Sequence, residues 1–507
     1  MFSSDDLSQI QQHGLVIETV EEQISNYKNG FPPSALAASS LVGSGIKSID
    51  DQEKESLCKA FEKYAKSHRV VKFVPASGAA SRMFKKLFAF AESYKGGEEE
   101  YKGLVADRAR GSMFDFFKNI EMFAFYEDLK TAYKTSTGVD LAEAHVKREY
   151  VNIIKHLLES PGLEYGRLPK GLLKFHNYED GPRTPVEEHL VEASEYAICG
   201  DKEVHIHFTV SPEHQPKFEN HISHIQQAYE ERYGISIQVS YSTQKPSTDT
   251  IAVDLENEPY REEDGRLLFR PAGHGALLEN LNDIDADVVF LKNIDNVVPD
   301  HLKPETVVNK KVIGGILVAV QEKVFSYIDR LESDFNDLLL EEIREFAEKD
   351  LGVKVSSKAD REELISILNR PIRICGMVKS EGDPGGGPFW VKAEGLTSLQ
   401  IVETAQIDLS DEAQRSVFNQ ATHFNPVDLV CGVKDYRGKK FDLMRFRDAS
   451  AGFVTEKSKG GKSLKAQELP GLWNGSMANW NTVFVEVPLI TFNPVKEVTD
   501  LLKPEHQ

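Results

Sequence analysis

Carboxylate and lysine side chains from three separate places are the first candidates for chemistry. Asp295 follows the apolar run 287–292, Lys170 follows a proline, and Lys496 lies in the segment 492–496. A carboxylate at the end of a strand suits Mg²⁺, which usually takes one or two protein carboxylates together with substrate phosphates. Lysines supply the positive charge that a polyphosphate needs. These residue types favour phosphate chemistry, while a turn-capping aspartate and solvated surface lysines are the alternatives.

A loop early in the chain has the composition of a phosphate-binding turn. The β-branched and aromatic run 70–74 is typical of a buried strand, and a proline ends it. Small residues follow, among them Ala76, Ser77 and Gly78, before a helical pattern starts at Arg82. Small side chains let backbone amides approach an anion, and a helix N-terminus adds partial positive charge. An ordinary turn between strand and helix is the alternative, because one glycine does not make a fingerprint.

Three further patterns are weaker. The segment Pro271-Ala272-Gly273-His274-Gly275 opens a predicted helix, where a glycine-flanked backbone can press flat against a ligand, although an isolated turn is the alternative. His205 and His207 share one face of a predicted strand, which favours a packed polar face over a metal site. The run 460–463 suggests a P-loop, but Glu456 stands where its first glycine belongs, so we reject it.

The elements that must position these residues indicate an α/β fold. Strands alternate with helices after about residue 200, which favours a mostly parallel sheet. A helix is expected at 215–233 and a long helical stretch at 312–350, with one apolar face that includes Val324, Ile328, Leu331, Phe335 and Leu339. The expected strands are 70–74, 204–210, 235–241, 287–292, 372–378, 399–404 and 427–431.

Length and pattern predict three parts in the 507 residues. Residues 1–67 form a helical N-terminal region. Residues 68–370 form a nucleotide-binding α/β domain that carries a helical insertion at about 88–165. Residues 371–507 are richer in strands and include a glycine-rich loop at 382–388.

Composition limits the partners. The net charge of −20 argues against a nucleic-acid binder and requires a local basic cluster for any anionic substrate. Four cysteines stand far apart, the N-terminus lacks a basic leader, and the longest apolar run is too short to span a bilayer. We therefore expect a cytoplasmic protein without a membrane partner, and the sequence leaves the oligomeric state open.

In order along the chain, these pieces resemble the UDP-sugar pyrophosphorylases, the UTP–glucose-1-phosphate uridylyltransferase group. They also resemble a bacterial family described only as a domain of unknown function. The similar segments are the loop 75–83, Pro169-Lys170, Gln244, Pro271-Ala272-Gly273-His274-Gly275, Asn293-Ile294-Asp295-Asn296, Glu403-Thr404-Ala405-Gln406, Phe424-Asn425, and Phe492-Asn493-Pro494-Val495-Lys496 with Asp500-Leu501-Leu502.

The resemblance implies a glycosyltransferase-A-like nucleotidyltransferase: a mostly parallel mixed sheet with helices on both faces. Its reaction joins a nucleoside triphosphate, with UTP as the first candidate, to a sugar 1-phosphate and releases pyrophosphate. The implied metal is Mg²⁺ on Asp295, with Arg82, Lys170 and Lys496 as the catalytic cations. The implied nucleotide-binding residues are Ala76, Ser77, Gly78, Gln244, Gly273, His274 and Gly275, and the sugar-binding residues are Glu403 and Asn425.

Two points of this assignment stay open. Some ninety residues separate the loop from Lys170, so Lys85 or Lys86 is an alternative phosphate lysine. A glycosyltransferase that consumes a nucleotide sugar is a rival, and Asp283-Ile284-Asp285 has the Asp-x-Asp spacing of such enzymes, but it precedes its strand. A nucleotide or sugar sensor without turnover is the rival from another class.

Overall fold

The computed structural model describes residues 2–78, 80–333, 336–382, 385–393 and 395–507. An 11-stranded mixed sheet forms its centre, in the order β2-β3-β19-β12-β16-β10-β4-β6-β5, with β7 beside β6 and β15 beside β12. Most strand pairings are parallel, as the sequence predicts. The strands are β2 (Leu41–Val42), β3 (Gly45–Lys47), β4 (Val70–Pro75), β5 (Ile198–Cys199), β6 (Glu203–Val210), β7 (Ser236–Thr243), β10 (Val288–Leu291), β12 (Ile372–Lys379), β15 (His423–Phe424), β16 (Leu429–Gly432) and β19 (Asn481–Glu486).

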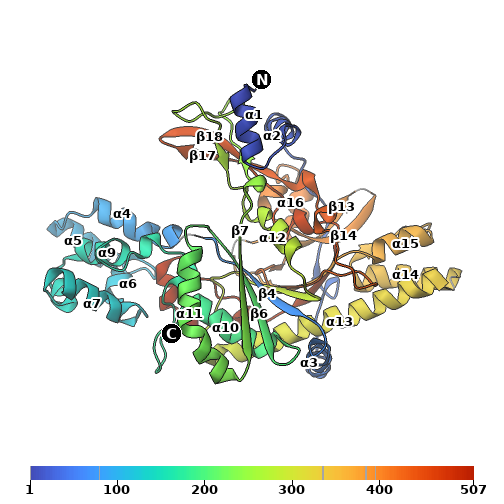
Figure 1. Ribbon diagram of the computed structural model, residues 1–507, viewed down its shortest axis with the longest axis horizontal. Helices are drawn as coiled ribbons and strands as arrows, with labels where there is room; N and C mark the ends of the chain where they lie inside the picture. Colours follow the sequence, from blue (N-terminus) through green and yellow to red (C-terminus); the bar gives the residue numbers. More distant parts are fainter. Residues whose placement is uncertain (1, 79, 334–335, 383–384, 394) are drawn as a thin grey trace.

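Helices cover both faces of this sheet, which confirms the predicted fold class. Val70 and Val74 of β4 point into a core shared with α3 (Asp51–Ala65), α10 (Pro185–Tyr196), α11 (Gln215–Tyr233) and α13 (Lys303–Ser333). Val71 and Phe73 point to the opposite core, which includes α12 (Leu277–Asp283). Because both faces are buried, β4 shows no apolar–polar alternation, and even its one charged residue, Lys72, is fully buried. Figure 1 shows α13 running beneath the sheet.

A block of helices stands to one side of the sheet (Figure 1). It has its own aromatic-rich core, which includes Phe116, Phe125 and Tyr133. The C-terminal Val495, Val498 and Leu501 pack into the same core. The helices are α4 (Lys85–Ser93), α5 (Glu98–Ala106), α6 (Met113–Lys118), α7 (Tyr126–Thr137), α8 (Leu141–Val146) and α9 (Tyr150–Leu158).

Smaller units complete the chain. A four-stranded sheet, in the order β1-β13-β14-β11, packs beside the central one, and helices α1 and α2 lie against the hairpin β17–β18 and the pair β8–β9 (Figure 1). The strands and helices of these units are β1 (Ala35–Ser39), β8 (Thr250–Ile251), β9 (Phe269–Arg270), β11 (Val353–Lys354), β13 (Gly387–Ala393), β14 (Leu396–Val402), β17 (Phe453–Lys459), β18 (Lys462–Glu468), α1 (Ser4–Gln12) and α2 (Ile17–Asn29). The remaining helices are α14 (Asp337–Asp350), α15 (Arg361–Leu368) and α16 (Glu412–Asn419).

One sequence expectation changes in detail. The stretch 312–350 contains two helices, α13 and α14, instead of one, and Asn336 accepts a capping hydrogen bond from Leu339 N at the start of the second. Val324, Ile328, Leu331 and Leu339 are buried as predicted, while Phe335 lies outside the described residues. No helix within the described residues is long and apolar enough to cross a bilayer.

The disfavoured metal pattern and the rejected P-loop pattern have structural explanations. His207 lies between the hydroxyls of Ser240 and Ser242, each 2.8 Å from a ring nitrogen, and stacks on Phe73. Desolvation lowers the pKa of His207 to about 4, so the ring is neutral. The described residues contain no group of three metal-ligating side chains. The run 460–463 is the turn of the hairpin β17–β18.

Candidate active site

The turn after β10 is joined to the segment 492–496. Val495 N donates to Asp295 O at 3.1 Å, and Asn493 N donates to the side-chain Oδ1 of Asn296 at 2.9 Å. Asn296 is buried, and its amide holds the two segments together. The strand end and the C-terminal segment therefore form one rigid edge, although about 200 residues of chain separate them.

Lys170 reaches this edge from a third segment. Its Nζ donates to Asp295 Oδ2 at 2.9 Å and to Val495 O at 2.8 Å. Its backbone N lies 3.4 Å from Gly78 O, so the loop after β4 is a neighbour. By contrast, Lys86 pairs with Glu497 at 2.6 Å. The lysine beside the strand-end carboxylate is therefore Lys170.

A cavity of about 430 Å³ opens beside this edge. Four of the residues singled out in the sequence line it: Asp295, Lys496, Glu403 and Asn425. Lys496 Nζ lies 5.9 Å from the ring centroid of Phe492, which also lines the cavity. The remaining lining residues are Asn293, Asn296, Gly385, Gly386, Thr404, Ala405, Phe424, Pro426, Val427, Trp473 and Pro494.

The glycine-rich loop forms one wall of the cavity. A Cβ on Gly386 would lie 2.4 Å from Ile401 Cγ2, and one on Gly385 would lie 2.7 Å from Phe424 Cδ2. Gly386 O accepts from Asn425 N at 2.9 Å. Glycine is therefore required here because the loop backbone presses against the neighbouring wall. Residues 383–384 of the same loop lie outside the described residues.

Asn425 is held by its own surroundings. Its Nδ2 donates to Gly376 O at 3.0 Å, and its Oδ1 accepts from Val427 N at 3.0 Å. These bonds fix the turn that follows β15. The amide oxygen has capacity for one further hydrogen bond, which is what remains for a ligand.

His274 connects the second glycine turn to the cavity. Its ring stacks on Trp473, with 4.1 Å between centroids, and its Nε2 lies 4.0 Å from Glu403 Oε1. Its Nδ1 accepts from Leu472 N at 2.9 Å, and desolvation lowers the pKa of His274 to about 4. The neutral ring therefore positions Trp473. A Cβ on Gly275 would lie 2.1 Å from Pro470 O, so this turn needs glycine to pack on its own protein.

The loop after β4 is less open than its composition suggests. Ala76 N already donates to Thr209 O at 2.8 Å, and Ala76 is buried. Ser77 and Gly78 are exposed, Ala79 lies outside the described residues, and Arg82 is exposed at the end of a short 3₁₀ turn. The α-helix begins at Lys85, three residues later than predicted.

Gln244 lies further along the same edge of the sheet. It follows β7, and the parallel strands β10, β4, β6 and β7 are consecutive neighbours. Three strand spacings place it about 14 Å from the end of β10. Its Nε2 donates to Asp249 Oδ1 at 3.0 Å. Gln244 is therefore outside the cavity but at the distance of the far end of an extended ligand.

A buried charge network supports the Asp295 turn from below. Glu192 pairs with Lys292 at 2.7 Å and with Lys72 at 2.9 Å, all three fully buried. Burial opposes ionisation of Glu192, but Lys292 and Lys72 hold its pKa well below its usual range. His189 lies above, with Nε2 3.2 Å from the carbonyl oxygens of both Asn293 and Ile294.

The donors on this edge fit a magnesium ion. Asp295 has a second carboxylate oxygen besides the one bonded to Lys170, and its side chain is 21% exposed. Glu403 is the other carboxylate that lines the cavity. Oxygen ligands from one or two carboxylates are what Mg²⁺ takes when substrate phosphates supply the rest. A complete protein cage is not required for this ion.

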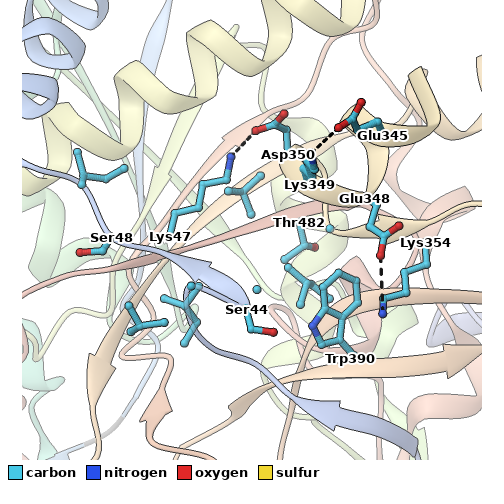
Figure 2. A pocket seen from close by; sticks show the side chains of 18 of the residues that line it. Ser44, Lys47, Ser48, Glu345, Glu348, Lys349, Asp350, Lys354, Trp390 and Thr482 are labelled. Carbon is cyan, nitrogen blue, oxygen red and sulfur yellow. Dashed lines mark hydrogen bonds and ion pairs between the residues drawn. The ribbon is translucent and has the colours of Figure 1, made fainter. Parts of the chain in front are cut away.

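A wider hollow, of about 820 Å³, lies away from these residues (Figure 2). Most of its charged residues are already paired, among them Lys47 with Asp350 at 2.6 Å and Lys354 with Glu348 at 3.8 Å. Lys354 also lies over the Trp390 ring. None of the residues predicted for the site lines this hollow.

Three aromatic residues that line the cavity are not predicted as site residues from the sequence. Trp473 stands in no recognisable motif, and only its pairing with His274 reveals it. Phe424 and Phe492, which contact each other edge to face at 5.2 Å, stand inside recognised motifs but were given no role. Their aromatic type beside Asn425 and Lys496 was the available signal.

Comparison with known families matches residues 3–507 to a domain of unknown function, DUF4301. The chain belongs to the DUF4301 family. This confirms the expected membership of a family described in those terms. The comparison with curated proteins finds no match.

Solved structures similar to this DUF4301 chain include several pyrophosphorylases. One is UDP-glucose pyrophosphorylase from Leishmania major in complex with UDP-glucose, with 13% identity, 99% of this chain and 79% of that chain covered, and a TM-score of 0.47. Another is uridine diphosphate N-acetylglucosamine pyrophosphorylase from Trypanosoma brucei, with 12% identity, coverage of 96% and 74%, and a TM-score of 0.46. UDP-glucose phosphorylase from Trypanosoma brucei has 12% identity, coverage of 98% and 77%, and a TM-score of 0.46.

Proposed function

We propose that this protein is a Mg²⁺-dependent nucleotidyltransferase that joins a nucleoside triphosphate, UTP first among them, to a sugar 1-phosphate. The observation that carries the proposal is the convergence of Lys170, Asp295 and Lys496 from three separate segments at one edge of the sheet. The net charge of the chain is negative, so a phosphate substrate would be repelled unless cations lie close to its binding site. Two lysines beside Asp295 supply that local positive charge.

The reaction needs positioning and charge more than a protein nucleophile. An oxygen of the sugar phosphate forms a bond to the α-phosphorus in line, and the bond from that phosphorus to the bridging oxygen breaks. Pyrophosphate leaves with the electron pair. Such transfers are accelerated by orientation and by cations aimed at the phosphoryl oxygens.

Each charged residue on the edge has a role in this proposal. Lys170 and Lys496 neutralise the transferring phosphoryl group and the sugar phosphate. Asp295 would hold Mg²⁺, which supplies charge neutralisation at the α-phosphate. Lys170 would stay bonded to Asp295 Oδ2, which leaves the second carboxylate oxygen of Asp295 as the candidate magnesium ligand.

The triphosphate tail and the base of the nucleotide contact residues beside this edge. Ser77 and Gly78 offer backbone amides to the β- and γ-phosphates, with Arg82 beyond them, and Ala76 anchors the loop through its bond to Thr209. Gln244 and the turn 273–275 recognise the base.

The sugar meets the opposite wall of the cavity. Glu403 accepts hydrogen bonds from its hydroxyls, and the remaining lone pair of Asn425 Oδ1 accepts one more. Both residues line the cavity of about 430 Å³. This gives the sugar and the triphosphate separate walls on the two sides of Asp295.

A pyrophosphate-release screen tests the proposal. Four nucleoside triphosphates are combined with a panel of sugar 1-phosphates in the presence of Mg²⁺, and nucleotide binding is measured by calorimetry in parallel. Release with at least one pair is expected. Binding of a nucleotide without release for any pair would replace the enzyme with a nucleotide sensor.

The rival glycosyltransferase is disfavoured by the position of its motif. Asp283 pairs with Lys245 at 2.7 Å, and Asp285 lies 3.6 Å from Lys434. Both aspartates precede β10, at the opposite end of the strand from Asp295. A nucleotide-sugar metal held there would be remote from the cavity.

A further inference from the structure

A second cavity, of about 580 Å³, lies behind one wall of the candidate site. The two cavities share that wall: Trp473 lines the first and Asn474 the second. Likewise, Glu403 lines the first cavity and Gln406 lines the second. Strands β13 and β14, the turn 447–451 and the segment 474–480 form most of the second cavity.

Two side chains of this cavity carry buried polar atoms without partners. Trp480 is 1% exposed and Asn474 is 4% exposed. Trp480 Nε1 and Asn474 Oδ1 have no hydrogen-bond partner among the described residues. Buried polar groups in proteins are nearly always satisfied, so each exception needs an explanation such as a ligand or an ordered water. One donor and one acceptor on the same cavity call for an occupant with both functions.

The charged groups that line the cavity are predominantly basic. They are Arg370, Lys392, Arg447 and Asp448. The Asp448 carboxylate already accepts from the backbone N and hydroxyl of Ser450 at 2.8 and 2.7 Å. A local excess of cations in a chain with a net charge of −20 selects an anion.

We propose that this cavity is a second ligand site, for a small hydroxylated metabolite that carries a phosphate or carboxylate group. Arg447 pairs with the oxyanion, because guanidinium forks match phosphate and carboxylate oxygens. A ligand hydroxyl donates to Asn474 Oδ1, and a ligand oxygen accepts from Trp480 Nε1. This site is separate from the sugar phosphate and nucleotide of the proposed reaction.

The three tryptophans of the chain make the proposal measurable. Trp390 lines the hollow of Figure 2, Trp473 the candidate active site and Trp480 the second cavity. Full-length protein labelled with 5-fluorotryptophan gives three ¹⁹F resonances, which are assigned with Trp→Phe variants. Glycerol 3-phosphate and glycerate are the probes, one for each oxyanion, and glycerol is the uncharged control.

We expect at least one probe to shift the Trp480 resonance saturably at millimolar concentration, while glycerol does not. R447M should weaken this response at least tenfold. R445M is the matched control, because Arg445 lies two residues away and lines a neighbouring cavity instead. Unchanged Trp390 and Trp473 resonances in the free variants show that they are folded.

Two results would overturn the site. One is that neither probe shifts Trp480. The other is an equal response in R447M and the wild type. Lys496→Ala removes one of the two lysines of the candidate active site, so a Trp480 response that survives this change does not depend on that lysine. The readout is binding alone, so it stands or falls separately from nucleotidyl transfer.

Discussion

Lys170 Nζ lies 2.9 Å from Asp295 Oδ2, across a sequence separation of 125 residues. The ion pair is partly exposed, with side-chain exposures of 14% and 21%. A pair in this position contributes little to stability but fixes two charges at the mouth of a cavity. The residues that prepare this edge for phosphate can therefore be separated experimentally from those that hold the fold.

Lys170→Met should reduce turnover strongly. Loss of a cation aimed at a transferring phosphoryl group costs about 10²-fold or more in kcat. Pyrophosphate release measures the effect, and thermal unfolding should change little. Lys174→Met is the matched control, because this lysine on the same segment pairs with Asp128 away from the cavity. Equal activity in both variants would exclude Lys170 from the reaction.

Asp295→Asn should weaken magnesium binding. The change removes the negative charge while it keeps the shape of the side chain. We expect the Mg²⁺ concentration for half-maximal activity to rise at least tenfold, and calorimetry with Mg²⁺ and nucleotide to show the same loss. Asp285→Asn, at the other end of the strand, should behave as wild type. A normal metal requirement in Asp295→Asn would contradict the assignment.

Lys496→Ala should raise the KM for the sugar 1-phosphate and lower kcat. The side chain lines the cavity beside Phe492, so its charge is expected at the sugar phosphate. Steady-state kinetics with each substrate varied in turn will separate the two effects. Lys503→Ala, a lysine of the same C-terminal segment that pairs with Asp500, is the control. Untouched kinetics in Lys496→Ala would refute its role.

His189 is expected to act as a positioning residue. Its Nε2 can donate to the carbonyl oxygens of the Asp295 turn when that nitrogen carries the proton. Burial lowers its pKa well below 6.5. His189→Gln keeps an N–H donor and should keep more magnesium affinity than His189→Leu. The half-saturating Mg²⁺ concentration distinguishes a positioning role from a purely structural one. A purely structural role would lower the magnesium affinity of both variants equally.

Stability should fall as the pH drops from about 6.5 towards 4. The native pKa of His207 is about 4, below the unfolded value of 6.5, so only the unfolded chain gains the proton in this window. One such histidine contributes a slope of at most about 1.4 kcal/mol per pH unit. Urea unfolding at several pH values measures it. His207→Asn should flatten the slope, whereas His224→Asn, on an exposed residue, should leave it unchanged.

The sequence predicts the elements of the fold better than the walls of the site. Strand β4 follows from a mostly apolar run and helix α11 from a periodic pattern, both of which local sequence determines. The break between α13 and α14 was missed because the apolar face continues across it, from Leu331 to Leu339.

The site depends on contacts that no local pattern encodes. Asp295 and Lys170 were recognisable one by one, but their ion pair arises from the packing of three distant segments. The hydrogen bond from Ala76 N to Thr209 O was equally unpredictable from sequence. It occupies a backbone amide that the small-residue composition of the loop had suggested for phosphate binding. Trp473 becomes visible only beside His274.

The segment 492–496 lies across the strand-end turn and completes the cavity. During synthesis, the ribosome releases Asp295 and Lys170 long before Lys496, so a nascent chain holds the carboxylate edge without its second lysine. The cavity therefore closes only after nearly all of the sheet has been made. A chain cut short by proteolysis or premature termination before residue 492 would lose Lys496 and the part of the wall that its segment forms, which ties the complete cavity to the segment 492–496.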